Sequence, residues 1–152
     1  MWRNKRWLML PLFGFFLSHH LGYAINHSES LPHKFYVVLK KNKYIQFKRG
    51  DHIVFKAPEN FPMKVDLLKK VYGEPGDSIE KIGDDFVINK ITKLLFQNYD
   101  SKNRPLLPGP VGILPRDHFF VATNHPQSYD SRYKNVGWIK KEDIIGLAYP
   151  VW

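Results

Sequence analysis

Three stretches that lie far apart in the sequence carry residue types suited to acyl-transfer chemistry. Ser28 and Ser30 stand one residue apart just before Pro32, directly after an apolar N-terminal segment. Lys69 lies in a strand-like run, and Ser128 lies in a polar segment near the C-terminus. A serine hydroxyl becomes an effective nucleophile when a nearby base takes its proton, and a desolvated lysine is one such base. We therefore hypothesise that Ser30 is a nucleophile that the two downstream segments activate.

The residue pattern around Lys69 indicates how a lysine becomes a base. Residues 65–72 read as a β-strand, in which alternate side chains face opposite sides. One face then carries Val65, Leu67, Lys69 and Val71. Lys70 falls on the other face with Asp66. Apolar surroundings lower a lysine pKa because the charged form loses hydration, so the pattern favours Lys69 over Lys70 as the base. The alternative is a lysine that extends from a strand edge to solvent.

The sequence after residue 26 predicts short strands separated by turns. The chain contains 11 prolines and 10 glycines, which favour many turns over long helices. Expected strands occupy residues 35–39, 44–47, 52–55, 65–72, 78–82, 86–88, 91–96, 118–122 and 144–149. Residues 98–110 are rich in Asn, Asp, Pro and Gly and predict a loop. We therefore expect a mainly β fold built from a compact antiparallel sheet.

The N-terminal segment has the pattern of a membrane anchor. Residues 7–25 contain no Asp, Glu, Lys or Arg, and their length of about 19 residues is close to the roughly 20 that span a bilayer core. The basic residues before them predict a cytoplasmic N-terminus and an exported remainder. The alternative is a cleaved signal peptide, with Gly22 and Ala24 near the cleavage site. We assign residues 1–25 to the anchor or signal segment and residues 26–152 to one domain.

Composition narrows the classes of function. The chain has 152 residues, a formal net charge of +9 and no cysteine. The absence of cysteine excludes disulfides, thiolate catalysis and cysteine-based zinc sites. The basic residues of the chain are scattered as pairs, a pattern that does not favour nucleic acid as a partner. The positive charge is instead compatible with attraction to anionic lipid headgroups.

The ordered set of segments resembles the sequence boxes of the type I signal peptidases. Residues 28–32 resemble the nucleophile box and residues 49–55 the second box of that family. Residues 69–77 resemble the lysine box, and Asn124 with residues 128–133 resembles the last box. The order of the boxes along the chain makes the resemblance specific.

The small size and the spacing from Ser30 to Tyr36 resemble the TraF-type conjugative transfer peptidases, which process pilin precursors. This resemblance implies a signal-peptidase type of β domain behind one transmembrane helix in a bacterial inner membrane, with the catalytic domain in the periplasm. A cleaved signal would instead give a soluble periplasmic protein. The implied partners are a precursor polypeptide, such as a pilin or preprotein, and the lipid bilayer, with no cofactor and no metal. We expect Leu31, Phe35 and Trp152 to lie against the bilayer.

The resemblance also implies a role for each residue of the site. Ser30 and Lys69 would form a Ser–Lys dyad, with Ser30 as nucleophile and Lys69 as general base. The Ser28 hydroxyl and the Ser30 backbone N–H would form the oxyanion hole. Ser128 would orient the lysine. Asp130 and Arg132 would support that loop as an ion pair.

Several other functions are compatible with parts of the sequence. Housekeeping removal of signal peptides and a catalytically inactive, membrane-anchored assembly factor are the main alternatives. A Ser-His-Asp site would need His118 or His125 with Asp117 or Asp130, but no Gly-x-Ser-x-Gly motif supports it. No His-Glu-x-x-His motif favours metal-dependent hydrolysis.

Overall fold

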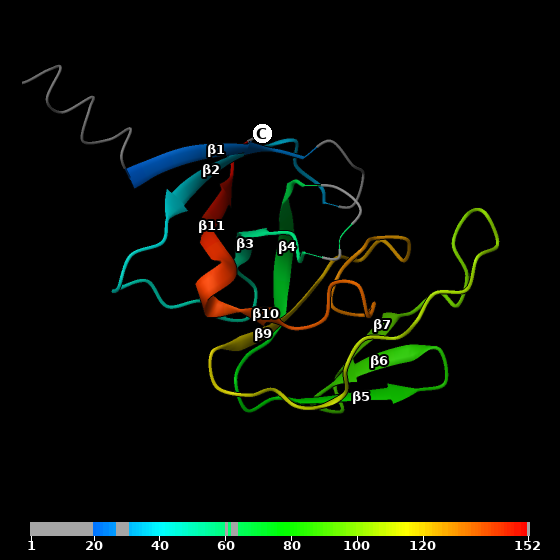
Figure 1. Cartoon of the computed structure of the whole chain (residues 1–152). Coiled ribbons are helices and arrows are strands. Elements are labelled where there is room, and N and C mark those ends of the chain that lie inside the picture. Colours follow the sequence, from blue (N-terminus) through cyan, green and yellow to red (C-terminus); the bar gives the residue numbers. More distant parts are fainter. Residues whose placement is uncertain (1–19, 27–30, 60, 62–63, 152) are drawn as a thin grey trace, which may run out of the picture.

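The protein is mainly β, as the sequence predicts. The computed structural model describes residues 20–26, 31–59, 61 and 64–151. Within these residues, all strand pairs are antiparallel, and they form one seven-stranded and one four-stranded sheet (Figure 1). The elements are β1 (Leu21–Ile25), β2 (Phe35–Lys40), β3 (His52–Lys56), β4 (Asp66–Gly73), β5 (Ser78–Ile82), β6 (Asp85–Ile88), β7 (Thr92–Leu95), β8 (Gly112–Ile113), β9 (His118–Ala122), β10 (Ile139–Lys140), the short 3₁₀ helix η1 (Lys141–Asp143) and β11 (Ile144–Pro150).

The larger sheet has the strand order β1-β2-β11-β3-β4-β9-β10, and the smaller one the order β7-β6-β5-β8. Strand β11 therefore lies between β2 and β3, although it follows every other strand in the sequence. Figure 1 shows β1 and β2 at one end of the molecule and β5, β6 and β7 at the other. Strand β4, which carries Lys69, lies between them.

Strand β9 connects the cores of the two sheets. Its sequence, His-Phe-Phe-Val-Ala, is apolar at four successive positions, which is typical of a strand buried on both faces. Phe119 and Val121 pack into the core cluster of the larger sheet, with Ile53, Phe55 and Val71. Phe120 and Ala122 point the opposite way, into the cluster of the smaller sheet with Phe86 and Phe96. The alternation of side chains along β9, a strand of the larger sheet, thus fills the core clusters of both sheets.

The predicted strand at residues 44–47 is wrong. The described chain between β2 and β3 has no strand there, because Asn42 starts a turn in which its side-chain oxygen accepts the Tyr44 N–H at 2.9 Å. Tyr44 is exposed, whereas Phe47 is buried in the core cluster of the larger sheet. Strands β2 and β3 are both neighbours of β11, so this segment connects two strands that are not adjacent. The short runs Gly112–Ile113 and Ile139–Lys140 form strands that the sequence pattern did not predict.

Strand β1 occupies residues that the sequence assigned to the N-terminal segment. Leu21–Ile25 pairs with β2, with Tyr23 opposite Val37, so these residues belong to the larger sheet. Among the described residues, no helix has the length and apolar character needed to cross a membrane. Residues 1–19 lie outside the described part of the chain, and an anchor there stays a prediction.

Candidate active site

Strand β4 places Lys69 in an apolar environment. Leu67, Lys69 and Val71 share one face of the strand, and Val71 is fully buried in the core cluster of the larger sheet. The Lys69 side chain lies beside Ile53 of β3 and is only 7% exposed. Lys70 faces the other side and is half-buried, with its ammonium 5.5 Å from the centre of the Tyr72 ring. The predicted difference between the two neighbouring lysines is therefore present in the structure.

The surroundings of Lys69 favour its neutral form. Burial lowers the pKa of the Lys69 ammonium, the Arg132 guanidinium lowers it further, and the Asp130 carboxylate opposes the shift. The Lys69 Nζ donates a hydrogen bond of 2.6 Å to the Ser128 Oγ. A lysine in this state has a lone pair at lower pH than a solvated one, as a general base requires.

The loop that carries Ser128 is fixed by a buried ion pair. Asp130 and Arg132 are both almost inaccessible to solvent, and their closest atoms, Oδ2 and Nη2, lie 2.7 Å apart. A second bond of 2.9 Å joins Arg132 Nε to Asp130 Oδ1, so the pair is bidentate. Burial raises the pKa of the Asp130 carboxyl group, and the guanidinium beside it opposes that shift.

Arg132 also binds three backbone carbonyl groups from two other parts of the site. Its guanidinium donates to Leu95 O at the end of β7, and to Thr123 O and His125 O in the segment before Ser128. The Thr123 N–H in turn donates to Asp130 Oδ2 at 3.2 Å. The ion pair therefore ties the start of the loop to its end and to the smaller sheet.

The structure brings Lys69, Ser128, Asp130 and Arg132 together, from residues far apart in sequence. Ser28 and Ser30 lie outside the described residues. Of the neighbouring positions, Asn26 Nδ2 donates to Leu31 O at 3.1 Å. Leu31 is buried in a third core cluster, on the other face of the larger sheet, so the expectation that it lies against the bilayer is wrong. Phe35 is exposed, and Trp152 lies outside the described residues.

The two histidines of the alternative Ser-His-Asp site have other partners. His118 Nδ1 lies 2.9 Å from Arg116 O, and His125 Nδ1 accepts the Gln127 N–H at 3.2 Å. Asp130, the proposed acid, binds Arg132. Hydrogen bonds among the described residues therefore do not assemble that site.

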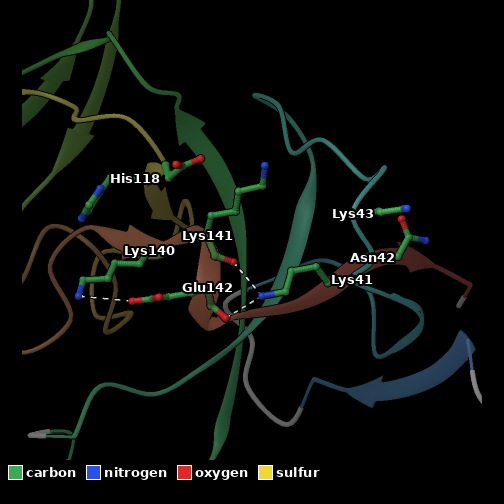
Figure 2. A pocket seen from close by; sticks show the side chains of 8 residues that line it. Lys41, Asn42, Lys43, His118, Lys140, Lys141 and Glu142 are labelled. Carbon is green, nitrogen blue, oxygen red and sulfur yellow. Dashed lines mark hydrogen bonds and ion pairs between the residues drawn. The ribbon is translucent and has the colours of Figure 1, made fainter.

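An open groove of about 790 Å³ lies away from these residues, at the other end of β9. Its lining consists of Lys41, Asn42, Lys43, Asp117, His118, Lys140, Lys141 and Glu142. Figure 2 shows that two of its lysines are engaged within the protein: Lys41 Nζ donates to two carbonyls of η1, and Lys140 pairs with Glu142 at 3.6 Å. Within the described chain, no group of three or more His, Cys, Asp and Glu side chains is arranged to hold a metal ion.

Sequence reasoning did not single out Tyr133 as part of the site. Its hydroxyl donates a hydrogen bond of 2.8 Å to Pro126 O, two residues before Ser128. Tyr133 is the final residue of the last box, but its partner is a backbone group that only the folded chain brings near.

Comparison with known proteins assigns a family to this arrangement. The family model described as signal peptidase, peptidase S26, matches residues 7–152 of the 152-residue sequence. The chain belongs to the signal peptidase family. The predicted resemblance to the signal peptidase family is thereby confirmed, and the roles of the individual box residues stay predictions.

The chain is also similar to individual proteins. A signal peptidase I P from Bacillus subtilis subsp. natto is 32% identical over 120 residues, which cover 70% of this chain and 62% of the relative. The conjugal transfer protein TraF from Agrobacterium fabrum is 34% identical over 88 residues, which cover 57% of this chain and 48% of the relative. The crystal structure of a signal peptidase I from Enterococcus faecalis is 26% identical, with a TM-score of 0.45 over 68% of this chain and 97% of the other. The chain thus spans about half to three-fifths of the length of the curated relatives it matches.

Proposed function

We propose that the chain is a serine endopeptidase in which Ser30 is the nucleophile and Lys69 is the general base. The observation that carries the proposal is the state of Lys69, which is almost fully buried, has a lowered pKa and contacts Ser128 Oγ at 2.6 Å. A buried lysine with no catalytic task costs stability, because desolvation disfavours its charge. Membership of the signal peptidase family supports the same assignment.

The proposed reaction has two steps. Ser30 Oγ attacks the scissile carbonyl while neutral Lys69 takes its proton, and the resulting ammonium later protonates the leaving amine. Water then releases the acyl group from Ser30, with Lys69 again as base. The Ser28 hydroxyl and the Ser30 N–H stabilise the charge on the tetrahedral oxygen. Ser128 orients Lys69 throughout.

The proposed substrates are exported precursor proteins, with a pilin precursor of a conjugation system as the specific candidate. The similarity to a conjugal transfer protein supports this choice. Removal of ordinary signal peptides is the second candidate, and the similarity to relatives named signal peptidase I supports it. Both reactions begin with the same acyl-enzyme.

We also place the protein at the bacterial inner membrane, with its β domain in the periplasm. The apolar residues that precede β1, from position 7 onward, support an anchor, whereas Leu21–Ile25 belong to the larger sheet. Side by side on β1, β2 and β11, Tyr23, Val37 and Tyr149 form a row of exposed side chains. We call this row, together with Ile25 and Phe35 beside it, the apolar patch.

The apolar patch lies on the same face of the sheet as Lys69. The cross-strand register places Lys69, Ile53, Leu147 and Leu39 in one row. Leu39 and Val37 are two residues apart on β2, so their side chains point to the same side. A lipid surface against the apolar patch would therefore hold the catalytic face close to a membrane-borne precursor.

The direct test is cleavage of two co-expressed precursors, one a pilin precursor and one an ordinary preprotein, measured by intact mass. We expect Ser30→Ala and Lys69→Ala to lose activity by about 10⁴-fold or more, while both remain folded. Lys70→Ala is the matched control, because Lys70 lies on the opposite face of β4, and it should keep activity.

The product masses distinguish the candidates. Cleavage of one precursor alone assigns the substrate, and the mass of a pilin product separates trimming from cyclisation. Unchanged processing by Ser30→Ala would refute the serine mechanism. A wild-type protein that cleaves neither precursor would favour the inactive assembly factor.

A further inference from the structure

Tyr133 is buried directly behind the loop that carries Ser128. Its side chain is 3% exposed, and its ring centre lies 5.1 Å from that of Phe96 and 6.1 Å from that of Tyr129. These ring contacts do not involve the hydroxyl, so a phenylalanine at this position could also make them. The hydroxyl has its own partners: it donates to Pro126 O at 2.8 Å and accepts the Gln97 N–H at 3.3 Å. The hydroxyl thus joins the start of the Ser128 loop to the chain that follows β7.

The side chains of Ser131 and Arg132 hold the part of the loop that follows Ser128. Ser131 pairs with Val121 of β9 through both its backbone N–H and its side-chain oxygen, each at 2.9 Å. Arg132 is fixed by Asp130 and by backbone carbonyls on either side. Both anchors lie three or more residues after Ser128.

The segment before Ser128 is held at Asn124 by the Tyr72 hydroxyl, at His125 by Arg132 and at Pro126 by Tyr133. Pro126 has no N–H, so its carbonyl is its only backbone group able to form a hydrogen bond. That carbonyl binds the Tyr133 hydroxyl. The Ser128 N–H donates to His125 O at 3.2 Å, and the same carbonyl accepts from Arg132. Loss of the Tyr133 hydroxyl would therefore remove the hydrogen bond that holds the Pro126 carbonyl within the protein, two residues from the side chain that contacts Lys69.

We propose that Tyr133 is a positioning residue, whose hydroxyl holds Pro126 so that Ser128 stays against Lys69. The inference rests on the proposed function and adds a residue to it. In this role Tyr133 acts through Ser128. Its contribution is to keep the orienting hydroxyl within hydrogen-bond distance of the base.

A looser Ser128 loop has a specific electrostatic consequence. Lys69 gains access to water, which restores the hydration of its ammonium, so its pKa moves back towards the ordinary value for lysine. The charged groups that act on Lys69 are Asp130, which raises its pKa, and Arg132, which lowers it. Both keep their mutual bonds when only the Tyr133 hydroxyl is removed. A change in the pKa of Lys69 would therefore report a change in the position of the Ser128 loop.

The test compares Tyr133→Phe with the wild-type full chain in detergent, using a precursor that the wild type cleaves. We expect kcat to fall about tenfold, as for the loss of one well-placed hydrogen bond, with KM unchanged. The acid limb of the kcat–pH profile should move to higher pH. Tyr99→Phe is the matched control, because it removes an exposed hydroxyl from the segment that follows β7, and it should match the wild type. A purely structural role for Tyr133 would lower thermal stability without moving the acid limb, and that result would overturn the proposal.

A second readout does not need activity. In the protein with ¹³C-labelled lysine, the Lys69 Cε resonance, assigned by its absence in Lys69→Arg, reports the protonation of Nζ. We expect its titration midpoint to rise in Tyr133→Phe and to stay unchanged in Tyr99→Phe. Equal midpoints in all three proteins would refute the positioning role. If the wild type cleaves no precursor but the midpoint of Lys69 still rises in Tyr133→Phe, the proposed function alone is refuted and the positioning role stands.

Discussion

The burial of Lys69 has opposite effects on stability and on the proposed activity. It lowers the stability of the folded protein, and it favours the neutral amine that a general base requires. The Lys69 side chain has the burial of a core residue and the chemistry of an ion. Because the folded state disfavours the ammonium, the folded protein binds fewer protons than the unfolded chain at pH values between the lowered pKa of Lys69 and the ordinary value near 10.4. Stability contributed by this position therefore rises with pH across that interval.

Replacement of Lys69 by methionine should stabilise the protein while abolishing catalysis. An apolar side chain of similar length avoids the desolvation cost, and we expect a gain of about 1 kcal/mol in the free energy of unfolding at pH 6. The gain should fade as the pH rises above the ordinary lysine value near 10.4, where the wild-type lysine is neutral in both states. Urea unfolding of Lys69→Met and wild type across this pH range measures the difference. Lys70→Met is the control and should show no such pH dependence; an equal gain at every pH would contradict the explanation.

At the residue scale, the sequence predicted side chains whose role follows from a local pattern. The choice of Lys69 over Lys70 needed only the alternation of a strand and the apolar character of its neighbours. The role of Tyr133 could not be predicted in this way, because the partners of its hydroxyl are the backbone groups of Pro126 and Gln97. Backbone groups have no sequence signature, and tertiary structure alone decides which of them meet.

At the scale of elements, the segment around Gly109 supports the part of the loop that carries the ion pair. The Gly109 N–H donates to Arg132 O at 2.7 Å, and Pro108 forms an isolated bridge with Tyr133. A Cβ at position 109 would collide with the backbone oxygen of Ser131. The close approach of the two backbones therefore requires glycine at this position.

Gly109→Ala should push the two segments apart. We expect a loss of about 1–3 kcal/mol in the free energy of unfolding, as is usual for overpacking, together with lower peptidase activity. Thermal unfolding and precursor cleavage measure the two effects. Gly22→Ala in β1 is the control, because a Cβ there would meet its nearest neighbours at an ordinary 3.8 Å. Wild-type behaviour of Gly109→Ala would show that the segments have room to separate.

The prediction of elements succeeded where a strand has its own turn signals. Strand β3 follows the Gly50 turn, and β4 ends before Pro75 and Gly76, so local residues marked these boundaries. The apolar run at residues 44–47 was misread because strand propensity does not tell whether a neighbouring strand is available. Strand β1 was missed because its residues continue an apolar stretch, and only the pairing with β2 separates them from it.

At the scale of the whole molecule, the apolar patch indicates which side of the domain should face a membrane. Soluble monomers rarely leave a continuous group of large apolar side chains exposed without a use for it. Because the patch shares a face with Lys69, we expect this side to meet lipid and the smaller sheet to point away from it.

A fluorescent probe can report this orientation, since the chain has no native cysteine. We expect a bimane probe on Val37→Cys in the apolar patch to be quenched by spin-labelled lipid when the full chain is reconstituted into anionic vesicles. The same probe on Ile91→Cys, an exposed apolar position beside the smaller sheet, is the control and should remain bright. Equal quenching at both positions would show that the domain has no preferred orientation.

The place of β11 in the larger sheet bears on when the proposed peptidase would become active during its own biosynthesis. While residues 144–150 are still missing from a growing chain, β2 and β3 have no common neighbour, and the sheet beside Lys69 is incomplete. Contacts between strands so distant in sequence also form slowly. We therefore expect a nascent chain to stay inactive until its last strand has been made and has paired, so that immature copies cannot cleave precursors that emerge alongside them.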